Sequence, residues 1–201
     1  MAEIEFVDHY RQDNGRIAGW QLEHGALDVR QQGILFIVKQ IKPESVLDLG
    51  CSDGTLLISM YKANLIQKGY GVDLWDSGIK WGKEYCERNK IPIVLINGPI
   101  ELYDGPNVDI AILAEILEHV HDPVECLKLA ATKAKKIIIT VPLLYKGPVN
   151  EIPEIQEHIR QYDYEMLEQH CKAAGLKITY KLKVESSHWP NLIVLTESEG
   201  K

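Results

Sequence analysis

The chain has 201 residues, of which 45% are hydrophobic and 25% charged, and its formal net charge is −7. This composition predicts one globular domain, large enough to bury its own core. The acidic balance argues against nonspecific binding to a polyanion. No apolar run is long enough to cross a membrane, and the first residues lack a signal-peptide pattern. Four separated cysteines without a Cys-x-x-Cys pair indicate reduced thiols, so we expect a cytoplasmic protein.

Residues 1–33 are polar with scattered aromatic side chains, and we expect a helical cap or extension there, in front of a main domain at 34–201. Two interpretations stay open for this segment. It is either a lid over a ligand site or an extension that only packs against the main domain. The main domain is expected to open with a helix over 32–41, because its apolar residues share one helical face and Pro43 stops it.

A glycine loop follows the first predicted strand. An apolar run that contains Asp48 breaks at Gly50, and a helical pattern begins after Gly54. The glycines let a ligand approach the main chain closely, and the loop ends at a helix N-terminus with unpaired N–H groups. A phosphate-binding P-loop is excluded because no Gly-Lys-Ser/Thr follows. The glycine spacing also differs from a dinucleotide fingerprint, which disfavours an NAD-dependent dehydrogenase.

A second strand, predicted over 70–75, ends in an acid. We expect the helix before it to stop at Gly69. A carboxylate at the tip of this strand, Asp73, can accept both hydroxyls of a ribose. The alternative is that Asp73 only caps the next helix, predicted over 76–89.

The third and fourth strands are predicted over 91–96 and 108–113. The loop between them, 97–102, is either a plain surface turn or an apolar surface for a flat ring. If residues 115–120 form a helical turn after the fourth strand, two carboxylates and an imidazole share one face. Such a group can hold a divalent cation such as Mg²⁺ or Mn²⁺.

The C-terminal part has the pattern of a sheet edge. A β-branched run over 135–141 predicts a central parallel strand, and the long loop that follows, 143–161, is of a length that is usually functional. A helix is expected over 163–174. An alternating strand with lysines on its wet side and a final apolar strand then suggest an antiparallel hairpin.

These motifs, in this order, resemble the class I S-adenosylmethionine (SAM) methyltransferases over residues 34–198. The first motif of that family is an apolar strand followed by Asp-x-Gly-x-Gly-x-Gly, and Ser52 replaces its middle glycine here, which is tolerable if Ser52 keeps a negative φ. The resemblance implies a three-layer α/β/α sandwich with a seven-stranded, mostly parallel sheet in the order 3-2-1-4-5-7-6, strand 7 being antiparallel. The implied SAM-binding residues are Asp48, Gly50, Cys51, Ser52, Gly54, Asp73, Leu74, Pro99, Ile100 and Ala114.

Two groups within the family are similar to this chain in a Glu-x-x-Glu-His pattern with a later histidine. They are the 2′-O-methyltransferases of small-RNA 3′ ends and the ubiquinone-pathway O-methyltransferases. In the RNA group the four side chains ligate a metal, and the matching residues here are Glu115, Glu118, His119 and His158. Family members without a metal also contain Leu-Glu-His-Val, and there the histidine packs or acts as a general base. His119 and His158 are therefore also the candidate catalytic residues.

The sequence thus predicts a SAM-dependent methyltransferase (EC 2.1.1.-) that methylates a hydroxyl of a small molecule, with or without a metal. The acidic charge disfavours the first alternative, an RNA 3′-end 2′-O-methyltransferase. The second alternative is an inactive SAM-binding regulatory module, against which the Glu/His set counts. The acceptor, the accepting atom and the oligomeric state stay open.

Overall fold

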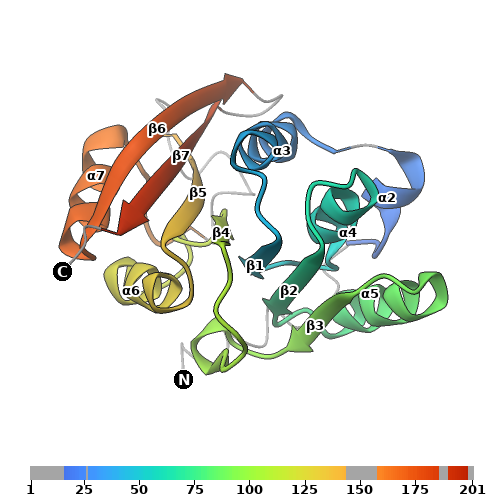
Figure 1. Cartoon of the computed structure of the whole chain (residues 1–201). Helices are drawn as coiled ribbons and strands as arrows, with labels where there is room; N and C mark the ends of the chain where they lie inside the picture. The colour runs from blue at the N-terminus through green and yellow to red at the C-terminus, as the bar shows by residue number, and fades with distance from the viewer. Residues whose placement is uncertain (1–15, 26, 144–157, 186–189, 199–201) are drawn as a thin grey trace.

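A seven-stranded sheet in the order β3-β2-β1-β4-β5-β7-β6 forms the centre of the molecule, as the computed structural model shows (Figure 1). The structure describes residues 16–25, 27–143, 158–185 and 190–198. Every pair of neighbouring strands is parallel except those made by β7, which is antiparallel to β5 and β6. The strands are β1 (Ser45–Leu49), β2 (Lys68–Asp73), β3 (Ile93–Asn97), β4 (Ile110–Ala114), β5 (Lys136–Pro142), β6 (Leu176–Glu185) and β7 (Pro190–Ser198).

Helices cover both faces of the sheet (Figure 1). One layer holds α3 (Val29–Ile41), α4 (Thr55–Lys62) and α5 (Asp76–Asn89), and the other holds α6 (Pro123–Lys133) and α7 (Tyr164–Ala173). A short helix, α2 (Trp20–His24), precedes α3, and the 3₁₀ helix η1 (Ile100–Leu102) follows β3. The predicted three-layer α/β/α sandwich is confirmed.

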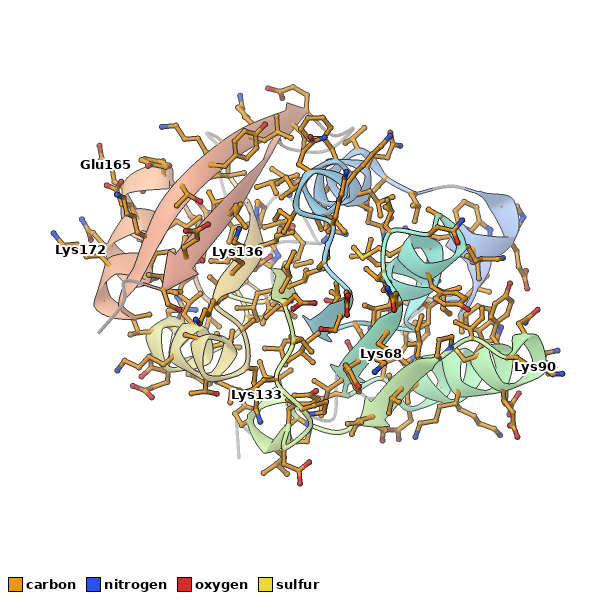
Figure 2. The ribbon with its side chains drawn as sticks, viewed as in Figure 1. Lys68, Lys90, Lys133, Lys136, Glu165 and Lys172 are labelled. Carbon is orange, nitrogen blue, oxygen red and sulfur yellow. The ribbon has the colours of Figure 1, made fainter. Side chains whose placement is uncertain are left out.

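The central strands alternate their side chains between two cores. In β4, Ile110 and Ile112 pack with α3, α4 and α5, whereas Ala111 and Leu113 pack with α6 and α7. All four side chains are fully buried, and each large one contributes about 1.5–3 kcal/mol of hydrophobic stabilisation. Charged side chains such as those of Lys90 and Glu165 project from the outer surface instead (Figure 2).

Helix and strand boundaries follow local chemistry closely. The helix predicted over 76–89 is α5, with the same bounds. Gly69, however, was predicted to stop a helix and lies instead inside β2, paired with Ile93. The helix ends earlier because Asn64 adopts a left-handed conformation (φ 55°) just after α4, which asparagine tolerates well.

Two further features of the described chain bear on function. None of its helices combines the length and the apolar character that crossing a membrane requires. All four cysteines of the sequence are free and buried. Burial raises the pKa of Cys86 to about 11 and those of Cys126 and Cys171 to about 12, so these thiols stay protonated at neutral pH.

Candidate functional site

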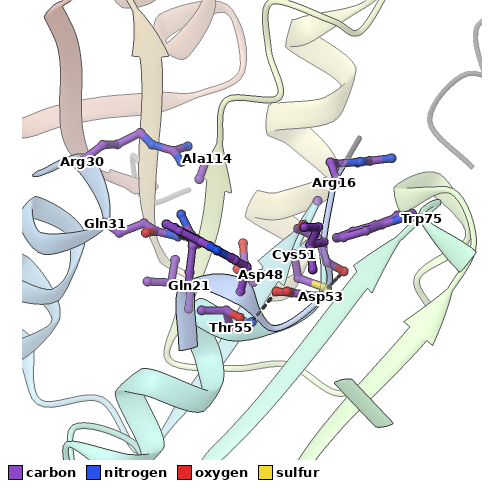
Figure 3. A pocket seen from close by; sticks show the side chains of 15 residues that line it. Arg16, Gln21, Arg30, Gln31, Asp48, Cys51, Asp53, Thr55, Trp75 and Ala114 are labelled. Atoms are coloured by element: carbon purple, nitrogen blue, oxygen red, sulfur yellow. Dashed lines mark hydrogen bonds between the residues drawn. The ribbon is translucent and has the colours of Figure 1, made fainter. Parts of the chain in front are cut away.

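A pocket of about 490 Å³ lies at the carboxyl ends of β1 and β4 (Figure 3). This is the end of an open α/β sheet at which ligands bind, and the volume suits one drug-sized molecule. Its walls come from the glycine loop after β1, the tip of β4, the first turn of α3 and the segment before α3, residues 16–25. Of the ten residues predicted to bind SAM, those that line the pocket are Asp48, Gly50, Cys51, Ser52 and Ala114.

The other five predicted residues lie around this pocket without lining it. Gly54 ends the glycine loop as the N-cap residue of α4, in a left-handed conformation (φ 81°). Asp73 and Leu74 lie at the tip of β2. Pro99 lies just before η1, and Ile100 is its first residue. The ends of β2 and β3 are held together, because the backbone N–H of Gly98 donates to the carbonyl of Asp73 at 2.9 Å.

The carboxylate of Asp73 is fixed by two backbone donors. Its Oδ2 accepts from the N–H of Ser52 at 2.7 Å, and its Oδ1 accepts from the N–H of Trp75 at 2.8 Å. Burial raises the pKa of Asp73, and these two N–H groups oppose that rise. Each carboxylate oxygen retains a second lone pair. Asp73 therefore ties the glycine loop to β2 and can still receive a polar ligand.

Ser52 departs from the expected backbone conformation. Its φ is +55°, the left-handed region, whereas the sequence match presumed a negative φ. The position thus keeps the geometry that a glycine adopts easily, and serine holds it at a strain cost. The N–H of Ser52 donates to Asp73 in this conformation, so the bond to β2 offsets part of the cost.

Asp48 is a buried carboxylate in the pocket wall. It is 2% exposed, and its Oδ1 has no hydrogen-bond partner within the part of the chain that the structure describes. Burial, with a smaller contribution from Asp73, raises the pKa of Asp48 to about 7, while Arg30 opposes the rise. A cationic ligand group beside Asp48 would satisfy this oxygen and favour its ionised form.

The segment before α3 forms one wall of the pocket. No site residue was predicted in this segment from the sequence. Arg16 lies over the ring of Trp75, 4.3 Å from its centroid (Figure 3). The side chain of Gln31 donates to that of Gln21 at 3.0 Å. Trp20 lines the pocket and is still 46% exposed. No motif marks these residues, since packing of a segment distant in sequence brings them to the loop.

Arg30 is a further pocket residue that the sequence did not identify, although a signal for it existed. It lines the pocket near Ala114 (Figure 3) and lies in the first turn of α3, where the helix dipole disfavours a cation. Burial alone would lower the pKa of Arg30, but Glu115 and Asp28 hold it above its usual value. An arginine at this helical position is a hint that a nearby anion stabilises it.

Glu115 does not join the predicted metal-binding face. Its φ is +57°, and the helical turn begins after it, with the N–H of His119 bonded to the carbonyl of Ile116. Its carboxylate is held elsewhere, accepting from Thr140 Oγ1 at 2.7 Å and from Asn191 Nδ2 at 3.0 Å. The expectation that Glu115 shares a face with Glu118 and His119 is therefore wrong.

The other three predicted residues converge. Donor atoms of Glu118, His119 and His158 lie within 4.8 Å of one another. Glu118 Oε1 is 3.9 Å from His119 Nε2, and the two imidazole rings meet edge to face with centroids 4.7 Å apart. Glu118 is fully buried, and neither of its oxygens has a hydrogen-bond partner among the described residues. Burial, then Glu115, raises the pKa of Glu118 well above its usual value.

This cluster lies beside the pocket and not in its wall. It can bind a cation or exchange a proton with a bound molecule. The pocket and the cluster adjoin at Gly50, which lines the pocket. A Cβ on Gly50 would collide with the side chain of Ile116, at the start of the turn that carries Glu118 and His119. Most of the long loop 143–161, expected to be functional from its length, lies outside the described residues, which omit 144–157.

Comparison with known proteins identifies the family of the chain. The profile of a family described as "Methyltransferase domain" matches residues 22–181. Over 104 residues the chain is 35% identical to the ubiquinone biosynthesis O-methyltransferase of Coxiella burnetii. This alignment covers 50% of this chain and 44% of that protein. The match thus spans less than half the length of that relative.

Solved structures share the fold. The 1,6-didemethyltoxoflavin-N1-methyltransferase of Burkholderia thailandensis superposes with a TM-score of 0.76 at 16% identity, covering 99% of this chain and 88% of that one. The magnesium protoporphyrin IX methyltransferase of Synechocystis PCC 6803 superposes with a TM-score of 0.67 at 14% identity, covering 84% and 77%. Because the family profile covers most of the sequence and the sheet order agrees with it, the chain belongs to the class I SAM-dependent methyltransferases.

Proposed function

We propose that this methyltransferase transfers the methyl group of SAM to a hydroxyl of a small molecule. The observation that carries the proposal is the convergence of Glu118, His119 and His158 beside the pocket. Methyl transfer to a hydroxyl requires a group that removes the proton, and an imidazole or a cation-bound oxygen serves that purpose. The O-methyltransferase activity of the Coxiella relative supports the hydroxyl as acceptor.

SAM would place its methionine part in the pocket and extend from it past the tip of β2. Asp48 can receive the ammonium of the methionine part, and Arg30 together with Gln21 can receive its carboxylate. At the tip of β2, Asp73 would accept the ribose hydroxyls, with Leu74, Pro99 and Ile100 beside the adenine. The sulfonium then lies near the tip of β4, from which the turn with Glu118 continues.

The donor set also fits a divalent cation. One carboxylate and two imidazoles are ligands that metals such as Mn²⁺ accept, and the bare, buried oxygens of Glu118 are what a cation would satisfy. Glu118, His119 and His158 would hold the ion, and Glu115 would not, since Thr140 and Asn191 already bind it. When bound, a cation would lower the pKa of a chelated hydroxyl.

The protein's own part in the reaction is placement. The sulfonium is already activated, so the pocket must align acceptor oxygen, methyl and sulfur and exclude water. Without a cation, His119 or His158 would take the proton from the acceptor oxygen as the oxygen attacks the methyl carbon and the carbon–sulfur bond breaks. S-adenosylhomocysteine leaves, and the protonated imidazole returns its proton to solvent.

The test is a methyl-transfer assay with and without EDTA, using catechols, vicinal-diol sugars and a short RNA with a free 3′ ribose. Glu118→Gln and His119→Ala should lower kcat by about 100-fold or more, while the Kd for S-adenosylhomocysteine stays within about twofold. His121→Ala, two residues along the same turn, is the matched control. Equal turnover by wild type and Glu118→Gln would contradict the proposal.

The same assay separates the alternatives. Methylation of the RNA alone would favour the RNA 3′-end 2′-O-methyltransferase. Binding of S-adenosylhomocysteine without methylation of any acceptor would favour an inactive SAM-binding module.

A further inference from the structure

Two segments about forty residues apart in sequence meet at the Glu118/His119/His158 cluster. One is the turn 116–121 after β4, and the other is the stretch 158–162 before α7. The N–H of Ile159 donates to the carbonyl of Glu118 at 3.0 Å. The contact places His158 on one segment against His119 on the other.

Arg160 makes the largest number of hydrogen bonds across this junction among the described residues. Its Nη1 donates to the carbonyls of Leu117 and Val120, and its Nη2 donates to the carbonyl of His121 at 2.9 Å. All three acceptors are main-chain atoms of the turn that carries Glu118 and His119. The guanidinium therefore binds the backbone of that turn and not the side chains of Glu118 and His119.

The chemistry of the turn explains why an arginine stands there. A single helical turn leaves its last carbonyls without intrahelical donors, and here only the Ile116 carbonyl is used within the turn, by the N–H groups of His119 and Val120. A guanidinium offers five N–H groups in a rigid planar fork, enough for several carbonyls at once. A lysine ammonium has the same charge but lacks the fork.

We propose that Arg160 is a positioning residue that fixes Glu118 and His119 against His158 by holding the turn 116–121. Its role in methyl transfer rests on the proposed function of that cluster, but its effect on geometry does not. Arg160 does not line the pocket, so we expect SAM binding to depend little on it. Loss of the fork loosens the turn and separates the two imidazoles while leaving the sheet and the glycine loop intact.

The experiment compares wild type with Arg160→Lys and Arg160→Gln. The first readout is the NMR cross-relaxation between the ring protons of His119 and His158, assigned with single histidine variants. The second readout is the Kd for S-adenosylhomocysteine, with thermal unfolding as a check on folding. The matched controls are Arg88→Lys and Arg88→Gln, at an exposed arginine of α5 that also donates to a backbone carbonyl, that of Glu84.

We expect both Arg160 variants to lose the inter-ring signal while the Kd for S-adenosylhomocysteine stays within about twofold, and the Arg88 controls to keep both. With an acceptor in hand, kcat should fall by about 100-fold, whereas KM for SAM is unchanged. Retention of the inter-ring signal in Arg160→Lys and Arg160→Gln would overturn the proposal. If both Arg160 variants lost ligand binding and also lost the cooperative thermal unfolding transition, the proposal would be overturned as well, since Arg160 would then stabilise the whole domain.

These outcomes are independent of the proposed function. If Arg160→Lys separates the rings but Glu118→Gln methylates normally, Arg160 positions the cluster and the cluster is not the reactive group. If Glu118→Gln is inactive and the rings stay together without Arg160, the proposed function stands and the positioning role fails.

Discussion

The backbone N–H of Gly19 donates to Oδ2 of Asp53 at 2.7 Å, which ties the segment before α3 to the glycine loop. The other oxygen of Asp53 accepts from the N–H of Thr55 at 3.0 Å, so one buried carboxylate serves both the segment and the start of α4. Gly19 has a φ of +80°, and a Cβ there would collide with the ring of Trp81. The segment can pack this closely against Trp81 of α5 only because residue 19 is glycine. We propose that it acts as a lid over the SAM pocket.

Gly19→Ala should therefore weaken binding of S-adenosylhomocysteine by about tenfold, a loss of about 1.4 kcal/mol, because the wall formed by the segment moves away from the pocket. Gly25→Ala is the matched control. Gly25 also has a positive φ (62°), but its missing Cβ would meet open space. Isothermal titration calorimetry gives both Kd values. Equal losses in the two variants would mean that backbone strain alone, and not the seating of the segment, is responsible.

Asp73→Asn should weaken S-adenosylhomocysteine binding by about 10- to 100-fold, since hydrogen bonds to a charged group contribute about 1.5–3 kcal/mol. An asparagine can accept from Ser52 or from Trp75 but its amide would face the other N–H. Asp104→Asn, at an exposed aspartate, serves as the control in the same titration. Unchanged affinity of Asp73→Asn would remove the ribose role and leave Asp73 as a residue that only orders the loop.

Substitutions at Ser52 should follow its left-handed φ of 55°. Ser52→Val should lower the free energy of unfolding by about 1–2 kcal/mol, because a β-branched side chain is strained there. Ser52→Gly should leave it within about 1 kcal/mol of wild type, since relief of strain and the greater freedom of the unfolded chain offset each other. Urea unfolding measures both.

Ser59→Val, in the regular helix α4, is the comparison for Ser52→Val. It should cost well under about 1 kcal/mol. A similar cost at the two positions would argue that residue 52 is not strained.

The pH dependence of stability should reveal Asp48. Its pKa in the folded protein is about 7, above the value of about 3.9 in an unfolded chain. The folded state therefore holds a proton that the unfolded state releases, so this contribution is full below about pH 4 and is lost as the pH rises through 7. The loss proceeds at up to about 1.4 kcal/mol per pH unit.

Asp48→Asn mimics the protonated form and has no such loss. Urea unfolding of the ligand-free protein between pH 5 and 8 should show the variant gaining on wild type up to about pH 7 and keeping a constant lead above it. Parallel pH profiles for the two proteins would place the pKa of Asp48 near its ordinary value.

Much of this fold could be predicted because the signals were local. The β-branched run of β5 and the periodic pattern of α5 lie within single segments, and Asp73 stands at the end of a strand pattern. The order of the strands followed from the resemblance of these motifs to a known family. Gly69 was misassigned because a glycine between a helix and a strand fits either a helix stop or a strand residue, and only pairing with Ile93 decides.

The site was harder to predict because tertiary packing decides it. Glu115 and Glu118 have the spacing of one helical face, yet a single positive φ at Glu115 turns its carboxylate toward Thr140. Arg16 reaches the pocket from the segment before α3, which has no motif of its own, and Arg30 reaches it from the first turn of α3. Spacing alone carries no information about which of two nearby carboxylates finds a partner elsewhere.

The buried cysteines make the chain suitable for selective chemical labelling. A thiol reagent attacks the thiolate, and burial keeps the four native thiols protonated and covered at neutral pH. A cysteine placed at Ile17, which is 70% exposed at the edge of the pocket, would be modified far faster than any of them. A fluorophore attached there, on an otherwise unaltered background, would follow cofactor arrival and departure in real time.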